Sequence, residues 1–589
     1  MSAFIPELIQ FAKERVNLTD TSQLLVILPT KRAVTLFHKQ WSLQSEQTEW
    51  LPLVITLQDF KERVSGVRAS GSNEWFVELY SAYRKFYPEG DSPEGFYATA
   101  KTLYSDFEEV RQHGIDPTSI FQKVRILQDL EQWDPNPNTD SPVLGNYLNF
   151  WENLATIYQE FYHRLEEKNM NTSSMVMEKL NARLEGGSAT DLTAWMGREI
   201  AQVVMAGFTA LTPLEQKMTE QLESRVEFHF VMDGIPAIPA SLGFEANHFI
   251  DRNQQQVKGF HLIQGQEKHR DPWSGVQTLH STDQAKVVGN YLSKLSPDQL
   301  DQTVLVLLDS SELPLLLNAL PPNVGEVNIG IGRSLAQTLP GRFILTWLQA
   351  LQADRPQREL YIQCLEEPLF RLWKGTKAQK DGIRWLQNPD NPLDSWRDYV
   401  EAQWGPWNWL FASHKSLLSS LRELIAEWLS HTKLKSYEVV FQEIETVLDQ
   451  TQETLENIPK HWMSSLSVEK FFLREMKSRQ ITFKGERTKG LQIMSLLETR
   501  ALDFRRMYVL SFNESAFPAI EHQSFIPLEV RKFYQLPSKT DREAALSYHF
   551  FRLLTRAEEV NLFHTADVQA LGGEKPPDTC CRLKMSGLL

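Results

Sequence analysis

The stretch LQIMSLLETRALDFRRMYVLSFNESAFP, Leu491–Pro518, predicts a strand, a loop, a second strand and a second loop. Leu491–Met494 and Met507–Phe512 are the apolar runs. Between them lies the segment Glu498–Phe504, which carries three charged residues, Glu498, Arg500 and Asp503. In open α/β sheets, ligands bind beyond the carboxyl ends of the strands. The pattern alone leaves two interpretations open, a loop that faces a binding cleft or a salt-bridged connection.

Apolar, β-branched runs of the same kind recur along the chain, and amphipathic helical stretches follow most of them. This alternation is typical of parallel sheets built from βα units. The runs are Leu24–Leu28, Val203–Ala206, Val226–Met232, Val304–Leu308, Leu491–Met494, Met507–Phe512 and Val560–Phe563. They fall into two sets, and each set straddles a long helical segment. We therefore expect an α/β fold with two parallel-sheet domains, each interrupted by a mainly helical domain.

The length and composition are those of a multidomain globular protein. A chain of 589 residues is expected to form three to five domains of roughly 100–200 residues each. The formal net charge of −14 argues against general coating of nucleic acid, so an anion site would need a local basic patch. Three cysteines are too few for a disulfide framework. We expect a cytoplasmic protein with no signal peptide and no association with a membrane.

The motifs of nucleotide and metal chemistry are missing from the sequence. No Gly-x-x-x-x-Gly-Lys-Ser/Thr loop is present to cradle phosphates, and the strand that ends at Ala206-Gly207 lacks the paired acids that would hold magnesium. The histidines are scattered and Asp233 is interpreted as a turn residue. No nucleophile elbow occurs. The sequence therefore predicts no cofactor, no metal site and no catalytic residue.

Basic residues directly after the first strand are candidates for an anion-binding site. The segment LPTKRAVTLFHKQW places Thr30, Lys31 and Arg32 at the start of a predicted helix. Cations are unfavourable at a helix N-terminus because the helix dipole is positive there. Their presence suggests an anionic partner.

Two further segments could contact nucleic acid. The run FFLREMKSRQITFKGERTKG, which contains Lys484 and Arg487, could line phosphates or form a solvated face. The segment QWGPWNWLF brings together Trp404, Trp407 and Trp409, which could stack on bases or form a domain core or a lid.

Three segments together resemble superfamily 1 helicases. LLVILPTKRAVTLFHKQW resembles motif Ia, and Leu491–Pro518 resembles the motif V region. DREAALSYHFFRLLTRAEEVNLFH resembles motif VI, with Thr555-Arg556-Ala557 at its Thr-Arg-Ala. The chain is more closely similar to AddB-type subunits of helicase–nuclease complexes, which belong to the inactivated superfamily 1 (UvrD-like) helicases. GLQIMSLLETRALDF is nearly that group's signature, and AGFTALTPLE and STDQAKVVGNYL extend the resemblance.

The resemblance implies two RecA-like domains of a degenerate P-loop NTPase fold, each with a helical insert. The implied domains are 1A at residues 1–66 and 184–262, 1B at 67–183, 2A at 263–342 and 481–575, and 2B at 343–480. It also implies a function, that of an ATPase-inactive DNA-binding scaffold in double-strand break repair and recombination. The implied partners are single-stranded or duplex-end DNA and an AddA-type helicase subunit. The alternative is a protein-interaction module whose vestigial helicase fold does not bind DNA.

The resemblance also assigns residues. The implied DNA-binding residues are Thr30, Lys31, Arg32 and Arg500, and the basic run described above adds Lys484 and Arg487 as expected DNA-binding residues. The implied residues of the interdomain cleft are Glu498, Asp503 and Arg556. With no ATP site, we expect Arg556 to brace the two α/β domains. We expect Arg500 to hold Glu498, Asp503 or a DNA phosphate.

The C-terminal residues depart from the family pattern. AddB-type chains continue into a PD-(D/E)xK nuclease domain, so the full-length parent is expected to be an exodeoxyribonuclease. Here the resemblance ends near Lys575, and PPDTCCRLKMSGLL follows at residues 576–589. We expect a frameshift near Lys575 in the gene or the clone, with a natural tail as the alternative. Sequencing the locus would distinguish them.

Overall fold

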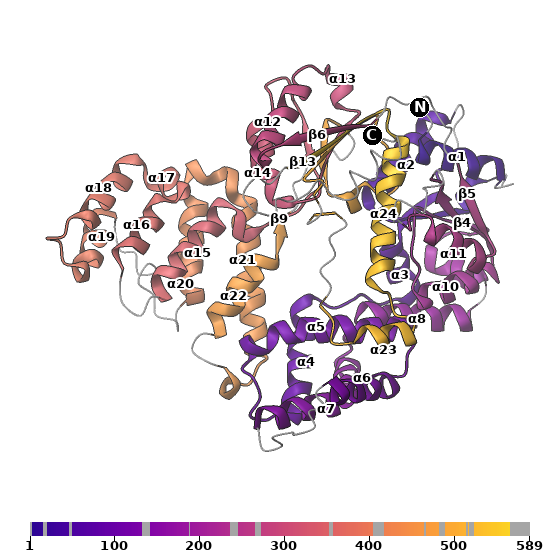
Figure 1. The fold of residues 1–589 in the computed structure, drawn as a ribbon, viewed down its shortest axis with the longest axis horizontal. Coiled ribbons are helices and arrows are strands. Elements are labelled where there is room, and N and C mark those ends of the chain that lie inside the picture. The colour runs from indigo at the N-terminus through magenta and orange to yellow at the C-terminus, as the bar shows by residue number, and fades with distance from the viewer. Residues whose placement is uncertain are drawn as a thin grey trace. The chain divides into compact units, whose positions relative to one another are not determined.

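The structure is a computed structural model, and its contacts divide the chain into two compact units (Figure 1). The first unit comprises residues 1–70, 102–331 and 483–589, and the second comprises residues 71–101 and 332–482. The structure describes residues 3–15, 20–45, 50–131, 142–187, 189–235, 245–264, 273–352, 357–404, 417–463, 467–481, 489–513, 516–517 and 523–565. Several residues singled out above lie outside this described part, namely Lys484, Arg487, Trp407, Trp409 and the tail 576–589.

The first unit contains a five-stranded sheet in the order β2-β1-β3-β4-β5, with every neighbouring pair parallel. Its strands are β1 (Leu24–Leu28), β2 (Leu53–Thr56), β3 (Gln202–Ala206), β4 (Glu227–Asp233) and β5 (Phe260–Ile263). Alternate residues of β1 pack into two different clusters, one with Leu25 and Ile27 and the other with Leu24 and Val26. Both faces of the sheet are therefore buried, which explains the continuous apolar run.

The same unit contains a six-stranded sheet in the order β6-β13-β12-β7-β11-β8, which is also parallel throughout. Its strands are β6 (Ser274–Thr278), β7 (Thr303–Leu307), β8 (Val327–Ile329), β11 (Leu491–Met494), β12 (Arg506–Leu510) and β13 (Glu559–Thr565). In β7, Val304 and Val306 pack on one side of the sheet, and Leu305 and Leu307 pack on the other. This sheet is likewise covered on both faces.

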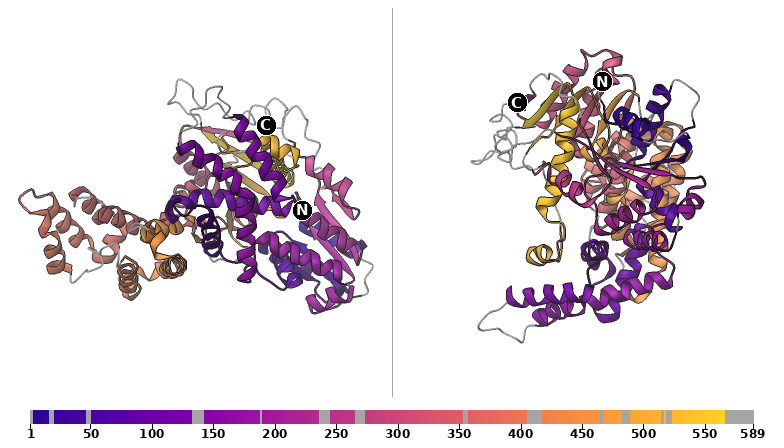
Figure 2. Two further views of the ribbon diagram at one scale, coloured as in Figure 1. Left: turned by 90° about the horizontal axis from the view of Figure 1, so that it is seen from below. Right: turned by 90° about the vertical axis from the view of Figure 1, so that its right-hand side faces the viewer.

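Helices of the first unit cover these four faces. The helices α1 (Phe4–Arg15) and α2 (Lys31–Gln44) cover one face of the five-stranded sheet. The other face is covered by α3 (Leu57–Ser65), α8 (Ser173–Gly186), α9 (Ala189–Met196), α10 (Pro213–Glu223) and α11 (His248–Gln256). The six-stranded sheet is covered on one face by α12 (Ser281–Leu292), α13 (Pro297–Leu300) and α14 (Leu313–Ala319). Its other face is covered by α24 (Lys539–Arg556), the long yellow helix of Figure 2.

The remaining helices of the first unit form a separate group. The helices α6 (Pro117–Glu131) and α7 (Pro142–Glu167) pack against each other, and α23 (Leu528–Phe533) packs on α6. The helix α5 (Pro93–Gln112) belongs to this unit from Thr102 onward.

The second unit is mainly helical. Its helices are α4 (Ser72–Phe86), α15 (Leu339–Gln352), α16 (Arg358–Glu366), α17 (Pro368–Lys374), α18 (Thr376–Gln387), α19 (Trp396–Trp404), α20 (Leu417–Ser430), α21 (Glu438–Glu456) and α22 (Ser467–Ser478). The short strands β9 (Arg333–Ser334) and β10 (Gln480–Ile481) pair antiparallel. Trp347, Trp373 and Trp428 are central to its core, and Trp404 packs against that core. For Trp404, the core interpretation is therefore correct.

The structure confirms the α/β class and the parallel sheets predicted from the sequence. Each of the seven apolar runs overlaps a described strand. Six short or polar strands of the described part were not predicted, namely β2, β5, β6, β8, β9 and β10. The predicted domain boundaries stay predictions. No helix in the described part of the chain has the length and apolar character needed to cross a membrane.

Candidate functional site

A buried cluster of charged residues joins β4 to α24 inside the first unit. Asp233 is the last residue of β4 and is only 1% exposed. Arg552 and Arg556 lie one turn apart on α24 and both donate to its carboxylate. Arg552 Nε is 2.7 Å from Oδ2, and Arg556 bonds both carboxylate oxygens through Nη2 and Nε. The interpretation of Asp233 as a turn residue was therefore wrong. Asp233 belongs to β4, and its buried carboxylate is stabilised by ion pairs with two arginines.

Asp503 joins the same cluster from the loop that precedes β12. Arg552 Nη2 donates to Asp503 Oδ1 at 2.7 Å, so Arg552 bridges Asp233 and Asp503. The backbone N–H of Phe4, the first residue of α1, donates to Asp503 Oδ2 at 2.6 Å. A carboxylate is favourable there because the helix dipole is positive at the N-terminus.

Glu7 completes the cluster from the first turn of α1. Arg556 Nη1 donates to Glu7 Oε2 at 2.7 Å, so Arg556 contacts two carboxylates. Burial alone would lower the pKa of Arg556, but the charge of Asp233 and its hydrogen bond outweigh burial and raise that pKa. Both arginines therefore stay charged, and their donors are committed to protein oxygens. The elements that meet here are α1, β4, α24 and the loop before β12.

The predicted cleft residues thus divide into two groups. Asp503 and Arg556 belong to the cluster, although they bond to different partners rather than to each other. Glu498 lies in the 3-10 helix Leu496–Thr499 and is partly exposed. No ion pair of Glu498 occurs among the described residues.

Arg500 does not pair with a carboxylate in the described part of the chain. Its Nε donates to the carbonyl oxygen of Leu497 at 3.0 Å. Burial lowers the pKa of Arg500, and the charge of Glu498 opposes that shift. Asp503, one of the partners expected for Arg500, is bonded to Arg552 and Phe4 instead. A contact between Arg500 and a DNA phosphate stays a prediction.

The three residues after β1 have three different surroundings. Thr30 is the N-cap of α2, and its Oγ1 accepts a hydrogen bond from Ala33 N at 3.1 Å. Lys31 is exposed to solvent. Arg32 is only 9% exposed and donates from Nη2 to Asn328 Oδ1 of β8 at 2.9 Å. Of the three, only Lys31 presents a charge on the surface.

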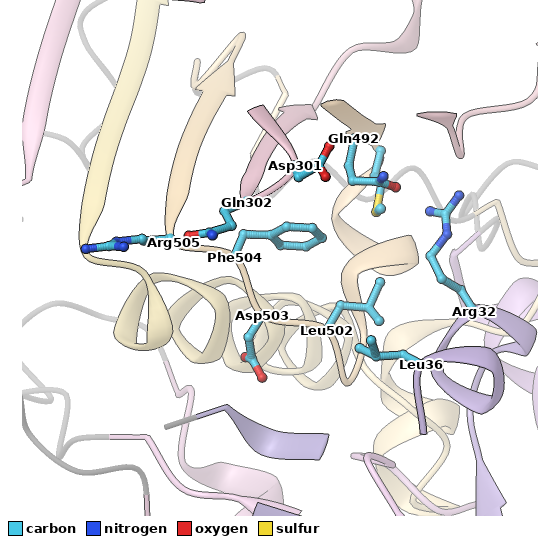
Figure 3. Close-up of a pocket in the computed structure, with 10 residues that line it drawn as sticks. Arg32, Leu36, Asp301, Gln302, Gln492, Leu502, Asp503, Phe504 and Arg505 are labelled. Atoms are coloured by element: carbon cyan, nitrogen blue, oxygen red, sulfur yellow. The ribbon is translucent and has the colours of Figure 1, made fainter. Parts of the chain in front are cut away.

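A cavity of about 140 Å³ lies beside Arg32 (Figure 3). It is lined by Arg32, Leu36, Asp301, Gln302, Gln492, Met494, Leu502, Asp503, Phe504 and Arg505. In Figure 3, the Phe504 ring and Leu502 point toward the space that faces Arg32, and Asp503 and Arg505 point away from it. The guanidinium group of Arg32 lies close to the backbone of Gly330. A Cβ at position 330 would lie 2.8 Å from Arg32 Nη1.

A second pair of acids, Asp106 and the partly buried Glu109, anchors the start of α24 and the chain before it to α5. Asp106 accepts from Ser524 Oγ and Phe525 N, both at 2.7 Å. Glu109 accepts from Arg531 at 2.5 Å and from Arg542 at 2.8 Å. These contacts join residues more than 400 positions apart in the sequence. The sequence offered no signal for this pairing.

The pH dependence of stability is expected to report on Asp106. Burial raises the pKa of Asp106 to about 6, against its hydrogen bonds from Ser524 and Phe525. Because the folded-state pKa lies above the unfolded value, this group contributes stability that is present at low pH and lost as the pH rises through about 6. Relative to Asp106→Asn, the wild type should gain about 2–3 kcal/mol of unfolding free energy between pH 7 and pH 4. Urea unfolding across this range measures it, and parallel curves for the two proteins would contradict it.

The site has no feature of metal or nucleotide chemistry within the described residues. No group of three or more His, Cys, Asp or Glu side chains is arranged to hold a metal ion in that part of the chain. The cluster is an internally paired set of charges that fixes four elements, and the adjoining cavity is the part of the site open to a ligand. No family model matches the chain, and no curated protein shows significant similarity to it.

Proposed function

We propose that this chain is an ATPase-inactive, helicase-like DNA-binding scaffold of the AddB type, acting with an AddA-type helicase subunit in double-strand break repair. The observation that carries the proposal is the arginine of the motif VI-like segment. Arg556 is saturated by Asp233 and Glu7, which occupy its donors as a nucleotide phosphate would. A helicase-like chain with this arrangement keeps its α/β domains together without ATP.

The parallel sheets agree with this proposal at the level of architecture. The five-stranded and six-stranded sheets are each covered by helices on both faces and lie in one unit, as two RecA-like domains would. The loop with Arg500 follows β11, and Lys31 follows β1. Residues after the carboxyl ends of parallel strands are favourably placed for ligands. Lys31 and Arg500 are therefore the residues that we assign to DNA.

Binding of single-stranded DNA should depend on salt and on Lys31. Because each neutralised phosphate releases counterions, the logarithm of the affinity should fall linearly with the logarithm of the salt concentration. Lys31→Ala should reduce that slope by about one. Fluorescence anisotropy with a labelled oligonucleotide measures it. Lys39→Ala is the matched control, since Lys39 is also exposed on α2 but lies two turns further along the helix.

Two other results would overturn parts of the proposal. If Lys31→Ala and Arg500→Ala both leave the affinity and its salt slope unchanged, the assigned DNA residues are wrong. Calorimetric titration with ATP and magnesium should show no binding, and saturable heat would establish a nucleotide site.

The net charge of −14 favours the rival, a protein-interaction module that does not bind DNA. Complete absence of DNA binding at low salt would support that rival.

A further inference from the structure

The second unit contains a cavity that takes no part in the site described above. Its volume is about 430 Å³, and its lining consists of Lys374, Lys377, Ala378, Asp381, Tyr399, Gln403 and Trp404. These residues come from α17, α18 and α19, which lie together in Figure 1. Ligand pockets are usually clefts of about 300–1,000 Å³. The cavity is therefore large enough to receive a ligand or a side chain of a bound segment.

Three side chains of the lining have polar groups that a ligand can reach. Lys377 and Gln403 are exposed to solvent, and Tyr399 is partly exposed. None of these three side chains has a hydrogen bond or an ion pair with another residue of the described part of the chain. Burial raises the pKa of Tyr399, and the charge of Asp381 adds to that rise, so the phenol stays protonated and can donate. The cavity thus offers an ammonium, a phenol and an amide as donors.

The other two charged residues of the lining have partners within the second unit. Lys374 Nζ lies 2.7 Å from Glu427 Oε1. Asp381 Oδ1 lies 3.9 Å from Arg384 Nη1. Among the described residues, Lys377 is therefore the charge of the lining that has no counterion.

The surface around the cavity is basic, although the net charge of the protein is −14. Residues 371–384 contain five basic side chains and one acidic side chain, a net charge of +4. Four of the five basic residues are exposed to solvent, namely Arg371, Lys377, Lys380 and Arg384. A local excess of one charge attracts partners of the opposite charge and speeds their encounter. The cavity and its surroundings therefore suit a ligand that is negatively charged and accepts hydrogen bonds.

The aromatic residues of the lining favour a peptide over single-stranded nucleic acid. Bases bind to protein surfaces by stacking on the face of an aromatic ring. The ring of Tyr399 is already stacked on Trp385 and Trp396, with centroids 5.0 Å and 5.4 Å away. Trp404 packs edge-on against Trp396 at 5.8 Å, and a Cβ at Gly382 would lie 2.9 Å from the Trp404 ring. These rings are engaged in the packing of the second unit, so the cavity suits a small polar group better than a base.

We infer that this cavity is the docking site for an acidic segment of a partner protein. A carboxylate of the segment enters the cavity and accepts hydrogen bonds from Lys377, Tyr399 and Gln403. Further acidic residues of the segment lie along α18, beside Lys380 and Arg384. Hydrogen bonds to a charged group are roughly twice as strong as neutral ones, so one inserted carboxylate can anchor the segment. The docking site belongs to the second unit alone and does not depend on DNA binding.

Two labelled peptides test the acidic segment on the full chain. One peptide is rich in glutamate, and the other has glutamine at each of the same positions. In fluorescence anisotropy, the glutamate peptide should bind at least about tenfold more tightly than the glutamine peptide, and its affinity should fall as the salt concentration rises. Lys377→Gln should weaken binding of the glutamate peptide about tenfold, because it removes a charged donor. Tyr399→Phe removes a neutral donor and should weaken it about threefold.

Two further variants separate the cavity from the general charge of the surface. Lys380→Gln is the matched control, since Lys380 is exposed on α18 as Lys377 is but does not line the cavity. It should change the affinity by less than about twofold. Asp381→Asn removes the acid of the lining and should tighten binding about threefold. Each variant should unfold at the wild-type temperature, because all these side chains are at least partly exposed. If Lys377→Gln and Lys380→Gln weaken binding equally, the inference is overturned.

A parallel titration with labelled single-stranded DNA separates this inference from the proposed function. Lys377→Gln should bind DNA as the wild type does. If the wild type binds DNA but not the glutamate peptide, the docking site fails and the DNA scaffold stands. If the glutamate peptide binds through Lys377 and no DNA binds, the docking site stands and the scaffold fails. If the peptide does not bind and Lys377→Gln weakens DNA binding, the cavity serves nucleic acid and the inference is overturned.

Discussion

Replacing Asp233 by alanine is expected to lower the free energy of unfolding by about 3–5 kcal/mol. Asp233 is buried and receives hydrogen bonds from Arg552 and Arg556. Removing one partner of a buried ion pair leaves the other charge out of water without compensation. Urea denaturation followed by circular dichroism measures the loss, and an unchanged dependence on urea concentration would show that the folded state keeps its compactness.

Lys539→Ala is the control for Asp233→Ala. Lys539 is on the same helix and pairs with Glu543 at 3.6 Å, but its side chain is 73% exposed. An exposed pair of this kind contributes roughly 0.3–0.5 kcal/mol, so the control should remain close to the wild type. A loss of less than about 1 kcal/mol in Asp233→Ala would mean that Asp503 and Glu7 compensate both arginines on their own.

The second large effect is expected at Gly207, the residue after β3. Its φ is +80°, a conformation that costs other residues about 1–2 kcal/mol. A Cβ there would lie 3.1 Å from the Cβ of Ala501, itself a residue with positive φ. Gly207→Val adds two more atoms to this contact. We expect it to lower the unfolding free energy by about 2–4 kcal/mol, measured in the same urea assay.

Gly186→Ala is the control for Gly207→Val. Gly186 is the last residue of α8, and a Cβ there would meet nothing within 4 Å. Alanine at such a position usually raises stability by about 0.4–1 kcal/mol. If Gly207→Val is as stable as the wild type, β3 and the loop with Ala501 are not in close contact. The same contact concerns the acids that are missing after β3, where a nucleotide hydrolase would hold magnesium. An acidic side chain at position 207 would meet the loop with Ala501, as valine would.

The strands could be predicted because burial leaves a direct trace in the sequence. Strands covered on both faces, such as β1, β7 and β12, require continuous apolar residues. The edge strand β6, SGVQT, is mostly exposed and carries no such trace. The inner strands were therefore sufficient to predict the fold class, whereas the edge strands could be located only in the structure.

The candidate site was predictable only in part. Asp503 and Arg556 were selected as residues of one region, and both lie in the cluster. Asp233 was missed because a single acid at the end of a strand is common in turns, and its partners are more than 300 residues away. The inward direction of Arg32 depends on Asn328 and on the space at Gly330, which no local pattern encodes.

The cluster also sets an order of events during synthesis of the protein. Phe4 and Glu7 are made first, yet their partners Asp503 and Arg556 follow about 500 residues later. At a translation rate of roughly 5–20 residues per second, α1 would wait on the order of half a minute or more for them. Until then Asp233 has no guanidinium beside it. We therefore expect the five-stranded sheet of a nascent chain to mature late, and ribosome-bound chains that stop before α24 to be more sensitive to protease around α1 than the finished protein.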